Sequence, residues 1–190
     1  MTALFSAGWN GMGMLEDLDR GVLDRFLVSP ARRWPFVAGP VAQASIVILI
    51  QSLIIIGLAL ISGASLAGGP IGLVVLLVAA VLLGAALAGF SNGLALLTRQ
   101  EETLIGAVTF ITLPLTFLST GLMPADLLPG WVEGVARFNP VNWAVEAGRE
   151  GLSPDMDWGV ILSRTGLLLL VALAFVWFAT RAFRNYQASI

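Results

Sequence analysis

Residues 34–98 read WPFVAGPVAQASIVILIQSLIIIGLALISGASLAGGPIGLVVLLVAAVLLGAALAGFSNGLALLT and contain no charged side chain. A charge at the bilayer centre costs at least ~2.5 kcal/mol, so an uncharged apolar run of this length indicates membrane-spanning helices. One span needs only about 20 residues, which makes the run too long for a single helix. Glycines and a proline at 68–70 interrupt it, because these residues break regular structure. We therefore predict two spans, over residues 36–61 and 71–97.

The remainder of the chain predicts two further spans, over residues 103–123 and 160–180. The 190 residues are 57% hydrophobic and 12% charged, whereas soluble domains carry about 25% charged residues. Residues 1–14 are apolar too, but as a helix they reach only about 21 Å and form at most a partial span. The expected fold class is an all-α polytopic membrane protein, one transmembrane domain with four complete helices.

The absence of two residue types limits the chemistry. The sequence has no Cys and no His, which removes disulfides, thiolate nucleophiles and the commonest metal ligand and general base. No span carries paired acids or a nucleophile with a base away from its ends, so we expect neither an enzyme, nor a metal site, nor a cofactor bound by this chain. The net charge of −2 provides no basic surface for nucleic acid.

The arginines predict the orientation. Cytoplasmic loops of membrane proteins are enriched in basic residues, and seven of the ten arginines flank the same ends of the predicted spans: Arg20, Arg25, Arg32, Arg33, Arg99, Arg181 and Arg184. The segment 124–157 on the other side is predominantly acidic. We expect a multi-pass protein of the cell membrane, in contact with lipid, with both termini cytoplasmic and residues 124–157 outside.

Residues 15–33 form the predicted cytoplasmic segment. Apolar side chains recur at helical spacing from Leu15 to Phe26, and charged side chains occupy the opposite face. The acids there could hold a metal ion, but Glu16 and Arg20 are four residues apart, the spacing at which a solvated helix face pairs its charges. We therefore expect an amphipathic helix on the inner membrane surface.

Polar side chains inside the spans define a candidate translocation path. Thr109, Thr112, Thr116 and Thr120 follow steps of three and four near Pro114, which predicts one hydroxyl-bearing face turned away from lipid. These hydroxyls either bond within and between helices, which we favour, or line a path for substrate. Gln51 lies near the middle of the first span and is expected to pair with a neighbouring helix.

The outer segment 124–157 predicts two short helices that dip into the membrane interface. One apolar pattern runs from Trp131 to Phe138, Asn139 and Pro140 break it, and a second pattern begins at Val141. Arg149 either pairs with Glu146 or Glu150, which we favour, or meets an anionic substrate.

Two motifs resemble a known family. Residues 18–30, LDRGVLDRFLVSP, are similar to the cytoplasmic segment between the second and third spans of type-2 ATP-binding-cassette exporter permeases, with the daunorubicin-resistance-like branch nearest. Residues 121–124, GLMP, and 139–142, NPVN, with Arg149 beyond them, resemble the outer re-entrant region between the fifth and sixth spans. The order and spacing of the spans agree, so the resemblance covers nearly the whole chain.

The resemblance implies a permease that moves a hydrophobic drug, a lipid or a glycan outward by alternating access. ATP and Mg would bind a separate ATP-binding subunit, and two permease copies would pair, most simply as a homodimer. The cytoplasmic segment would dock on the ATP-binding subunit through these residues: Asp19, Arg20, Gly21, Leu23, Asp24, Arg25 and Pro30. The outer re-entrant region would include Asn139, Pro140, Glu146 and Arg149.

The N-terminus departs from the family pattern. Members usually have six spans, whereas this sequence begins inside the equivalent of the second span, so we expect an N-terminally truncated permease. The alternative function is a non-transporting membrane assembly or regulatory protein, or an inactive permease fragment.

Overall fold

The computed structural model describes residues 2–20, 35–63, 67–121 and 130–188, and every regular element within these ranges is an α-helix. The all-α prediction is therefore confirmed for the part of the chain that the structure describes. The helices have the following bounds: α1 Thr2–Gly8, α2 Asn10–Asp19, α4 Pro35–Ile61, α5 Gly69–Thr98, α6 Glu101–Phe117, α7 Gly130–Ala136, α8 Pro140–Gly151 and α9 Trp158–Ala188.

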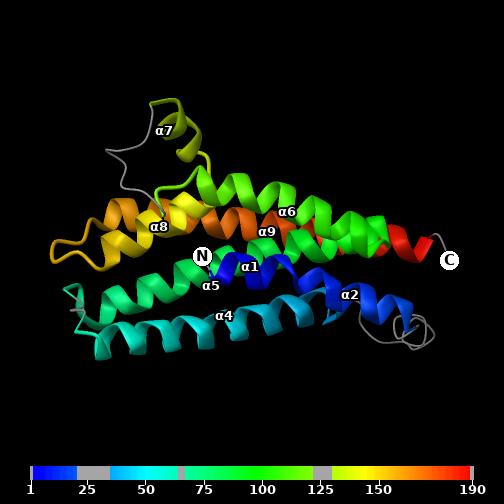
Figure 1. The fold of residues 1–190 in the computed structure, drawn as a ribbon, viewed down its shortest axis with the longest axis horizontal. Helices are drawn as coiled ribbons and strands as arrows, with labels where there is room; N and C mark the ends of the chain where they lie inside the picture. The colour runs from blue at the N-terminus through cyan, green and yellow to red at the C-terminus, as the bar shows by residue number, and fades with distance from the viewer. Residues whose placement is uncertain (1, 21–34, 64–66, 122–129, 189–190) are drawn as a thin grey trace.

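The long helices lie side by side in an elongated bundle (Figure 1). Helices α5 and α9 occupy the middle, α4 runs along one edge and α6 along the opposite edge. Helices α1 and α2 begin part-way along the bundle and follow α5 to the end where α6 starts, which we name the α2 end. The short helix α8 packs on α5 and α9 at the opposite, α8 end, where α7 stands away from the bundle.

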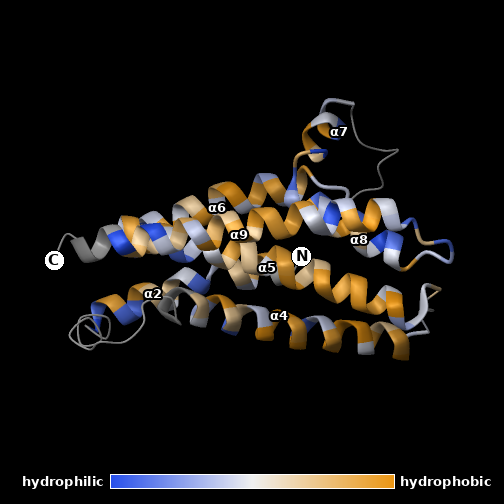
Figure 2. Ribbon diagram, turned by 180° about the vertical axis from the view of Figure 1, so that it is seen from behind, coloured by the Kyte–Doolittle hydropathy of each residue, from blue (hydrophilic) through white to orange (hydrophobic). Residues whose placement is uncertain are grey.

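Three of the described helices are long and apolar enough to cross a membrane: Ala38–Ile61, Gly69–Thr98 and Trp158–Arg184. They match the first, second and fourth predicted spans, and hydrophobic residues extend along them in Figure 2. Helix α6, at the position of the third predicted span, has 17 residues, fewer than the about 20 that a span needs. A fourth complete span therefore stays a prediction.

Small residues on α5 allow its neighbours to approach closely. A Cβ atom on Gly89 would lie 3.1 Å from the carbonyl carbon of Phe175, and one on Gly93 would lie 2.5 Å from a ring carbon of Phe178. These contacts join α5 to α9, so both glycines serve helix packing, as small residues do in membrane proteins. A Cβ atom on Gly84 would meet the Ile48 side chain of α4 at 1.9 Å.

Two clusters of buried hydrophobic residues form the core. The larger one joins α1, α4, α5, α8 and α9, and Leu4, Ile48 and Leu168 are fully buried within it. The second joins α2, α5, α6 and α9 at the α2 end, around Leu96 and Phe183. Helix α5 contributes to both clusters and so connects the two ends of the bundle.

The amphipathic helix predicted to begin at Leu15 begins at Asn10 instead, so the predicted start is wrong. The physical reason is a tertiary contact that helical periodicity does not reveal. The buried Ser91 hydroxyl of α5 donates to the Gly8 carbonyl at 2.6 Å and accepts from the Gly11 amide at 3.1 Å, satisfying backbone groups where α1 ends and α2 starts. The predicted residues 21–33 lie outside the described ranges.

Two glycines on α2 test this contact. A Cβ atom on Gly11 would lie 2.5 Å from the Ser91 hydroxyl and 2.6 Å from the Ser91 carbonyl oxygen, whereas nothing lies within 4 Å of one on Gly13. We expect Gly11→Ala to destabilise the protein by about 1–3 kcal/mol through overpacking, and Gly13→Ala to stabilise it by roughly 0.5–1 kcal/mol through helix propensity. Thermal unfolding in detergent measures both. Equal midpoints for the two variants would contradict the close packing.

Candidate functional site

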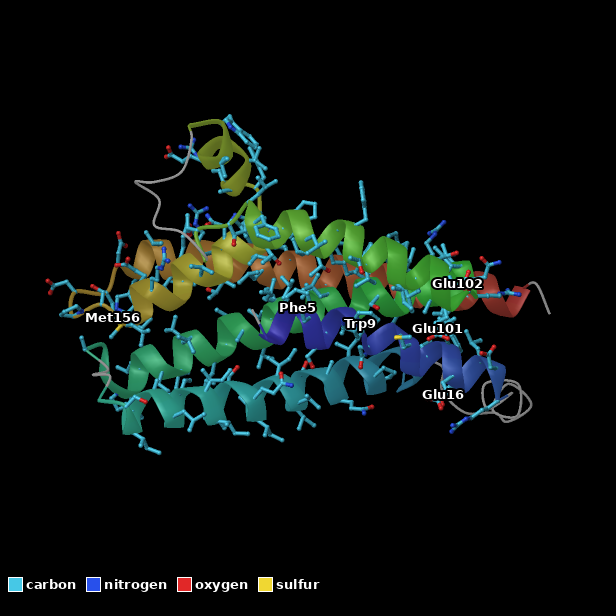
Figure 3. The ribbon with its side chains drawn as sticks, viewed as in Figure 1. Phe5, Trp9, Glu16, Glu101, Glu102 and Met156 are labelled. Atoms are coloured by element: carbon cyan, nitrogen blue, oxygen red, sulfur yellow. The ribbon has the colours of Figure 1, made fainter. Side chains whose placement is uncertain are left out.

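A charged cleft lies at the α2 end of the bundle. It has a volume of about 330 Å³, and its walls come from α2, the residue after α5 and the start of α6: Met12, Gly13, Leu15, Glu16, Asp19, Arg99 and Glu101. Arg99 follows α5 in the left-handed conformation, with φ 52°, and the extended Gln100 precedes α6. This sharp turn brings Glu101 beside α2, as Figure 3 shows for Glu16 and Glu101.

The predicted docking residues are partly within the described ranges. Asp19 and Arg20 are exposed at the end of α2, and the expected i,i+4 ion pair between Arg20 and Glu16 is present. The other predicted contact residues lie outside the described ranges: Gly21, Leu23, Asp24, Arg25 and Pro30. Arg99 and Glu101 line the cleft with Asp19, although the sequence did not lead us to expect them there. The sequence feature that could have identified them is the cluster of charged residues at 99–102, which separates two apolar stretches.

Carboxylates at this end do not form a metal site in the described part of the chain. No three Asp or Glu side chains there lie close enough together to hold an ion. The charged side chains of Glu16, Asp19, Arg99 and Glu101 are exposed.

At the α8 end, Asn139 joins α6 to α8. Its side-chain oxygen accepts from the Val141 amide at 2.9 Å and so caps the N-terminus of α8. Its amide nitrogen donates to the Leu115 and Leu118 carbonyls, at 2.7 and 3.0 Å. Pro140, the first residue of α8, suits that position because its missing N–H would have no intrahelical partner.

Asn142 continues the connection between these two helices. Its side-chain oxygen accepts from the Thr120 amide at 3.0 Å and from the Thr120 hydroxyl at 2.6 Å. Its amide nitrogen donates to a Glu146 carboxylate oxygen at 2.7 Å. Thr120 and Asn142 are both buried, so these bonds satisfy groups that would otherwise have no partner.

The predicted ion pair of Arg149 with Glu146 or Glu150 is wrong. Arg149 donates to the Thr120 carbonyl at 2.7 Å, while Glu146 pairs with Arg164 of α9 at 2.6 Å. Glu150 accepts from the Asp157 amide at 3.0 Å. Helical spacing identifies neighbours on α8 only, whereas α9 packs against α8 and supplies a nearer cation.

The predicted threonine face is only partly buried. Thr112 and Thr116 are buried on α6, and the Thr116 hydroxyl bonds back to the Thr112 carbonyl at 2.7 Å. Thr109 is exposed, so its predicted burial is wrong; it lies on the outward face of α6 with Phe110. Thr120 is buried in the turn that follows the helix, beyond the C-terminal residue Phe117.

Gln51 does not converge with the threonines. It lies on α4, at the opposite edge of the bundle from α6 (Figure 1). Its buried side-chain oxygen has no hydrogen-bond partner among the described residues, so the expected partner helix is not found there. The candidate path residues therefore do not form one continuous lining within this chain.

Asn92 is a buried polar residue whose partners sequence analysis did not address. It lies on α5 next to Ser91 and is 0% exposed, and neither its side-chain oxygen nor its nitrogen has a hydrogen-bond partner within the described ranges. A buried amide without partners costs about 1–3 kcal/mol. The sequence feature that could have identified this buried polar residue is an Asn within an otherwise apolar run.

Comparison with known proteins identifies the family. The family model described as ABC-2 type transporter matches residues 1–153. The chain belongs to the ABC-2 type transporter family. The resemblance seen in residues 18–30 and 139–142 is thereby confirmed.

Curated ABC-2 relatives are similar over most of this chain. The daunorubicin resistance ABC transporter permease protein DrrB1 of Streptomyces coeruleorubidus is 25% identical over 183 residues, 95% of this chain and 64% of the relative. The putative transport permease ycf38 of Pyropia yezoensis is 26% identical, over 86% of this chain and 60% of its own length. The probable doxorubicin resistance permease protein DrrC of Mycobacterium tuberculosis is 26% identical, over 90% and 63%.

The chain thus spans about three fifths of the length of these ABC-2 relatives. No solved structure matches it significantly. The comparisons establish the family, and the contacts described above show which residues of this member tie its helices together.

Asn92 and Ser91 should respond to substitution with opposite signs. We expect Asn92→Leu to raise the thermal unfolding midpoint, because an apolar side chain of similar shape removes an unpaired buried amide. Ser91→Ala should lower it, since the Gly8 carbonyl and Gly11 amide lose their partner. Circular dichroism during heating in detergent measures both. A lower midpoint for Asn92→Leu than for Ser91→Ala would refute the assignment.

Proposed function

We propose that this ABC-2 family member is the membrane permease subunit of an ATP-driven exporter, and that it moves a hydrophobic drug, a lipid or a glycan outward by alternating access. The observation that carries the proposal is the ABC-2 family match over residues 1–153. The printed names of two relatives, which refer to daunorubicin and doxorubicin resistance, support a hydrophobic drug as cargo.

ATP is hydrolysed by a separate subunit in this proposal. The sequence contains no G-x-x-x-x-G-K-[ST] loop, the motif that cradles nucleotide phosphates. Nucleotide and Mg therefore bind to an ATP-binding partner subunit. The conformational change of that subunit must be transmitted to the permease through a contact at the cytoplasmic surface.

The docking surface for this subunit is the α2 end of the bundle. Asp19 ends α2 and Arg20 follows it, and the cleft extends the surface to Arg99 and Glu101. Glu16, Asp17, Glu101 and Glu102 are also exposed there, so the surface formed by α2 and the start of α6 is predominantly acidic. A partner surface with exposed basic residues would complement it.

Charge reversal tests the docking surface. We expect Asp19→Arg with Glu101→Arg to reduce copurification with the ATP-binding subunit, because each substitution opposes a basic partner surface. The protein should still insert and unfold at its usual midpoint, since both side chains are exposed. Asp155→Arg, an exposed acid at the α8 end, is the matched control. Full copurification of the double variant would refute the docking assignment.

The topology in this proposal has four spans, with α6 as the third, and both termini in the cytoplasm of a cell-membrane protein. Seven charged residues lie on α2 and around the α5–α6 turn at one end of the bundle: Glu16, Asp17, Asp19, Arg20, Arg99, Glu101 and Glu102. Met156 marks the opposite end in Figure 3, and the acidic residues 155 and 157 beside it face the outside.

Single cysteines test the topology directly, because the chain has no Cys of its own. We expect a membrane-impermeant maleimide to label Asp155→Cys in intact cells and to label Arg20→Cys only after the membrane is opened. Both positions are exposed in the structure, so access is decided by the membrane. Labelling of position 20 in intact cells would reverse the orientation.

Two permease copies pair in the proposed exporter. The outward face of α6 carries Phe110, 79% exposed, and Phe117, 66% exposed, together with the exposed Thr109. A hydroxyl facing hydrocarbon loses its water partners, which favours a second protein copy over lipid on this face. Thr109 would then belong to a path between two copies, and Thr112 and Thr116 would support the helix from within.

A further inference from the structure

Several hydrogen bonds join the C-terminal end of α6 and the turn after it to α8. Asn139 donates to the Leu115 and Leu118 carbonyls, Asn142 accepts twice from Thr120, and Arg149 donates to the Thr120 carbonyl. These bonds tie residues 115–121 to residues 139–149. We name these two segments together the α6–α8 cap.

Pro114 separates the cap from the remainder of α6. A proline inside a helix has no N–H to donate, so the Phe110 carbonyl loses its intrahelical partner. On the other side of this break, Leu104 and Val108 anchor α6 in the hydrophobic cluster at the α2 end. Helix kinks concentrate at such prolines, which makes Pro114 one pivot of the cap.

A second pivot lies where α8 ends. The Gly151 carbonyl packs against α5 so closely that a Cβ atom would lie 2.0 Å from it on Gly68 and 1.9 Å from it on Gly72. This backbone contact leaves no space for the end of α8 to slide along α5. The C-terminal end of α8 is therefore fixed on α5, while its N-terminal part is fixed on α6.

Between the two pivots, an ion pair connects the cap to α9, beside the larger core cluster in which Val141, Trp143 and Ala147 of α8 are buried with Leu168 of α9. Glu146 Oε2 lies 2.6 Å from Arg164 Nε, and neither atom has another hydrogen-bond partner among the described residues. The two side chains are 31% and 27% exposed. The two contacting atoms themselves are buried, so loss of either partner leaves the other charge without compensation, which favours opening of the contact.

We propose that the α6–α8 cap moves as one body about Gly151 and Pro114, and that the ion pair between Glu146 and Arg164 is the latch that keeps it against α9. Arg164 is then a positioning residue, which acts through Glu146 on the whole cap. If the proposed export function is correct, opening this latch is the step that lets cargo leave at the α8 end.

Pulsed EPR distances between spin labels test the latch without any transport assay. One label pair, at positions 145 and 162, crosses the latch, and the other, at 117 and 145, lies within the cap. In lipid nanodiscs, Arg164→Gln should broaden the 145–162 distance distribution and leave the 117–145 distribution unchanged. Arg137→Gln, which neutralises an exposed arginine on the segment after α7, is the matched control and should change neither. An unchanged 145–162 distribution, or equal broadening of both, would overturn the proposal.

A crosslink tests whether opening is needed for export. Glu146→Cys with Arg164→Cys is joined by a reducible bis-methanethiosulfonate reagent in the complex with the ATP-binding subunit. Doxorubicin efflux should fall to the level without that subunit and return after reduction. Glu150→Cys with Asp157→Cys joins the end of α8 to the residue before α9, beside the Gly151 pivot, and should retain efflux when linked.

The two experiments separate the latch from the export function. Efflux that survives the 146–164 link, or is lost with both links, would overturn the latch as the exit step. Absence of doxorubicin efflux in the unmodified complex would count against the proposed drug export, while the EPR distances would still decide whether Arg164 holds the cap.

Discussion

The close approach of other helices to α5 is the constraint on which the rest of the structure depends. Helix α4 approaches α5 closely at Gly84, and α9 does so at Gly89 and Gly93. The backbone of α8 approaches α5 closely at Gly72. Lipid chains are as apolar as leucine, so burial alone does not drive helices together in a membrane, and van der Waals contact between backbones must contribute instead. A larger side chain at any of these positions would separate two helices along their length.

The long apolar helices could be predicted from the sequence alone, because a membrane span can be recognised from one continuous stretch of residues without knowledge of its neighbours. An uncharged apolar stretch identifies a span wherever it occurs, and this rule located α4, α5 and α9 from residues 36–61, 71–97 and 160–180. Two short helices within residues 124–157 followed from periodicity and from the Asn139-Pro140 break, and α7 and α8 confirm that they form, while their position at the membrane interface stays a prediction. The early start of α2 at Asn10 could not be predicted, since it depends on Ser91, eighty residues away.

The candidate site was less predictable for the same reason. Spacing on one helix suggested that Arg149 pairs with an acid of α8, but Glu146, three residues away, pairs with Arg164 of another helix. Thr109, three residues from Thr112, is exposed, because α6 lies at the edge of the bundle and turns one face outward. The sequence shows which residue types are present, whereas their partners required the three-dimensional arrangement.

The length of α6 has a consequence for the surrounding bilayer. Seventeen residues extend about 25 Å, whereas the thirty residues of α5 extend about 45 Å. As the proposed third span, a helix this short would either thin the membrane around it or complete the crossing with non-helical chain. Backbone groups outside a helix survive at membrane depth only when protein covers and bonds them. The asparagines at the start of α8 bond the Leu115, Leu118 and Thr120 backbone, so they extend the effective hydrophobic length of α6 beyond its last turn.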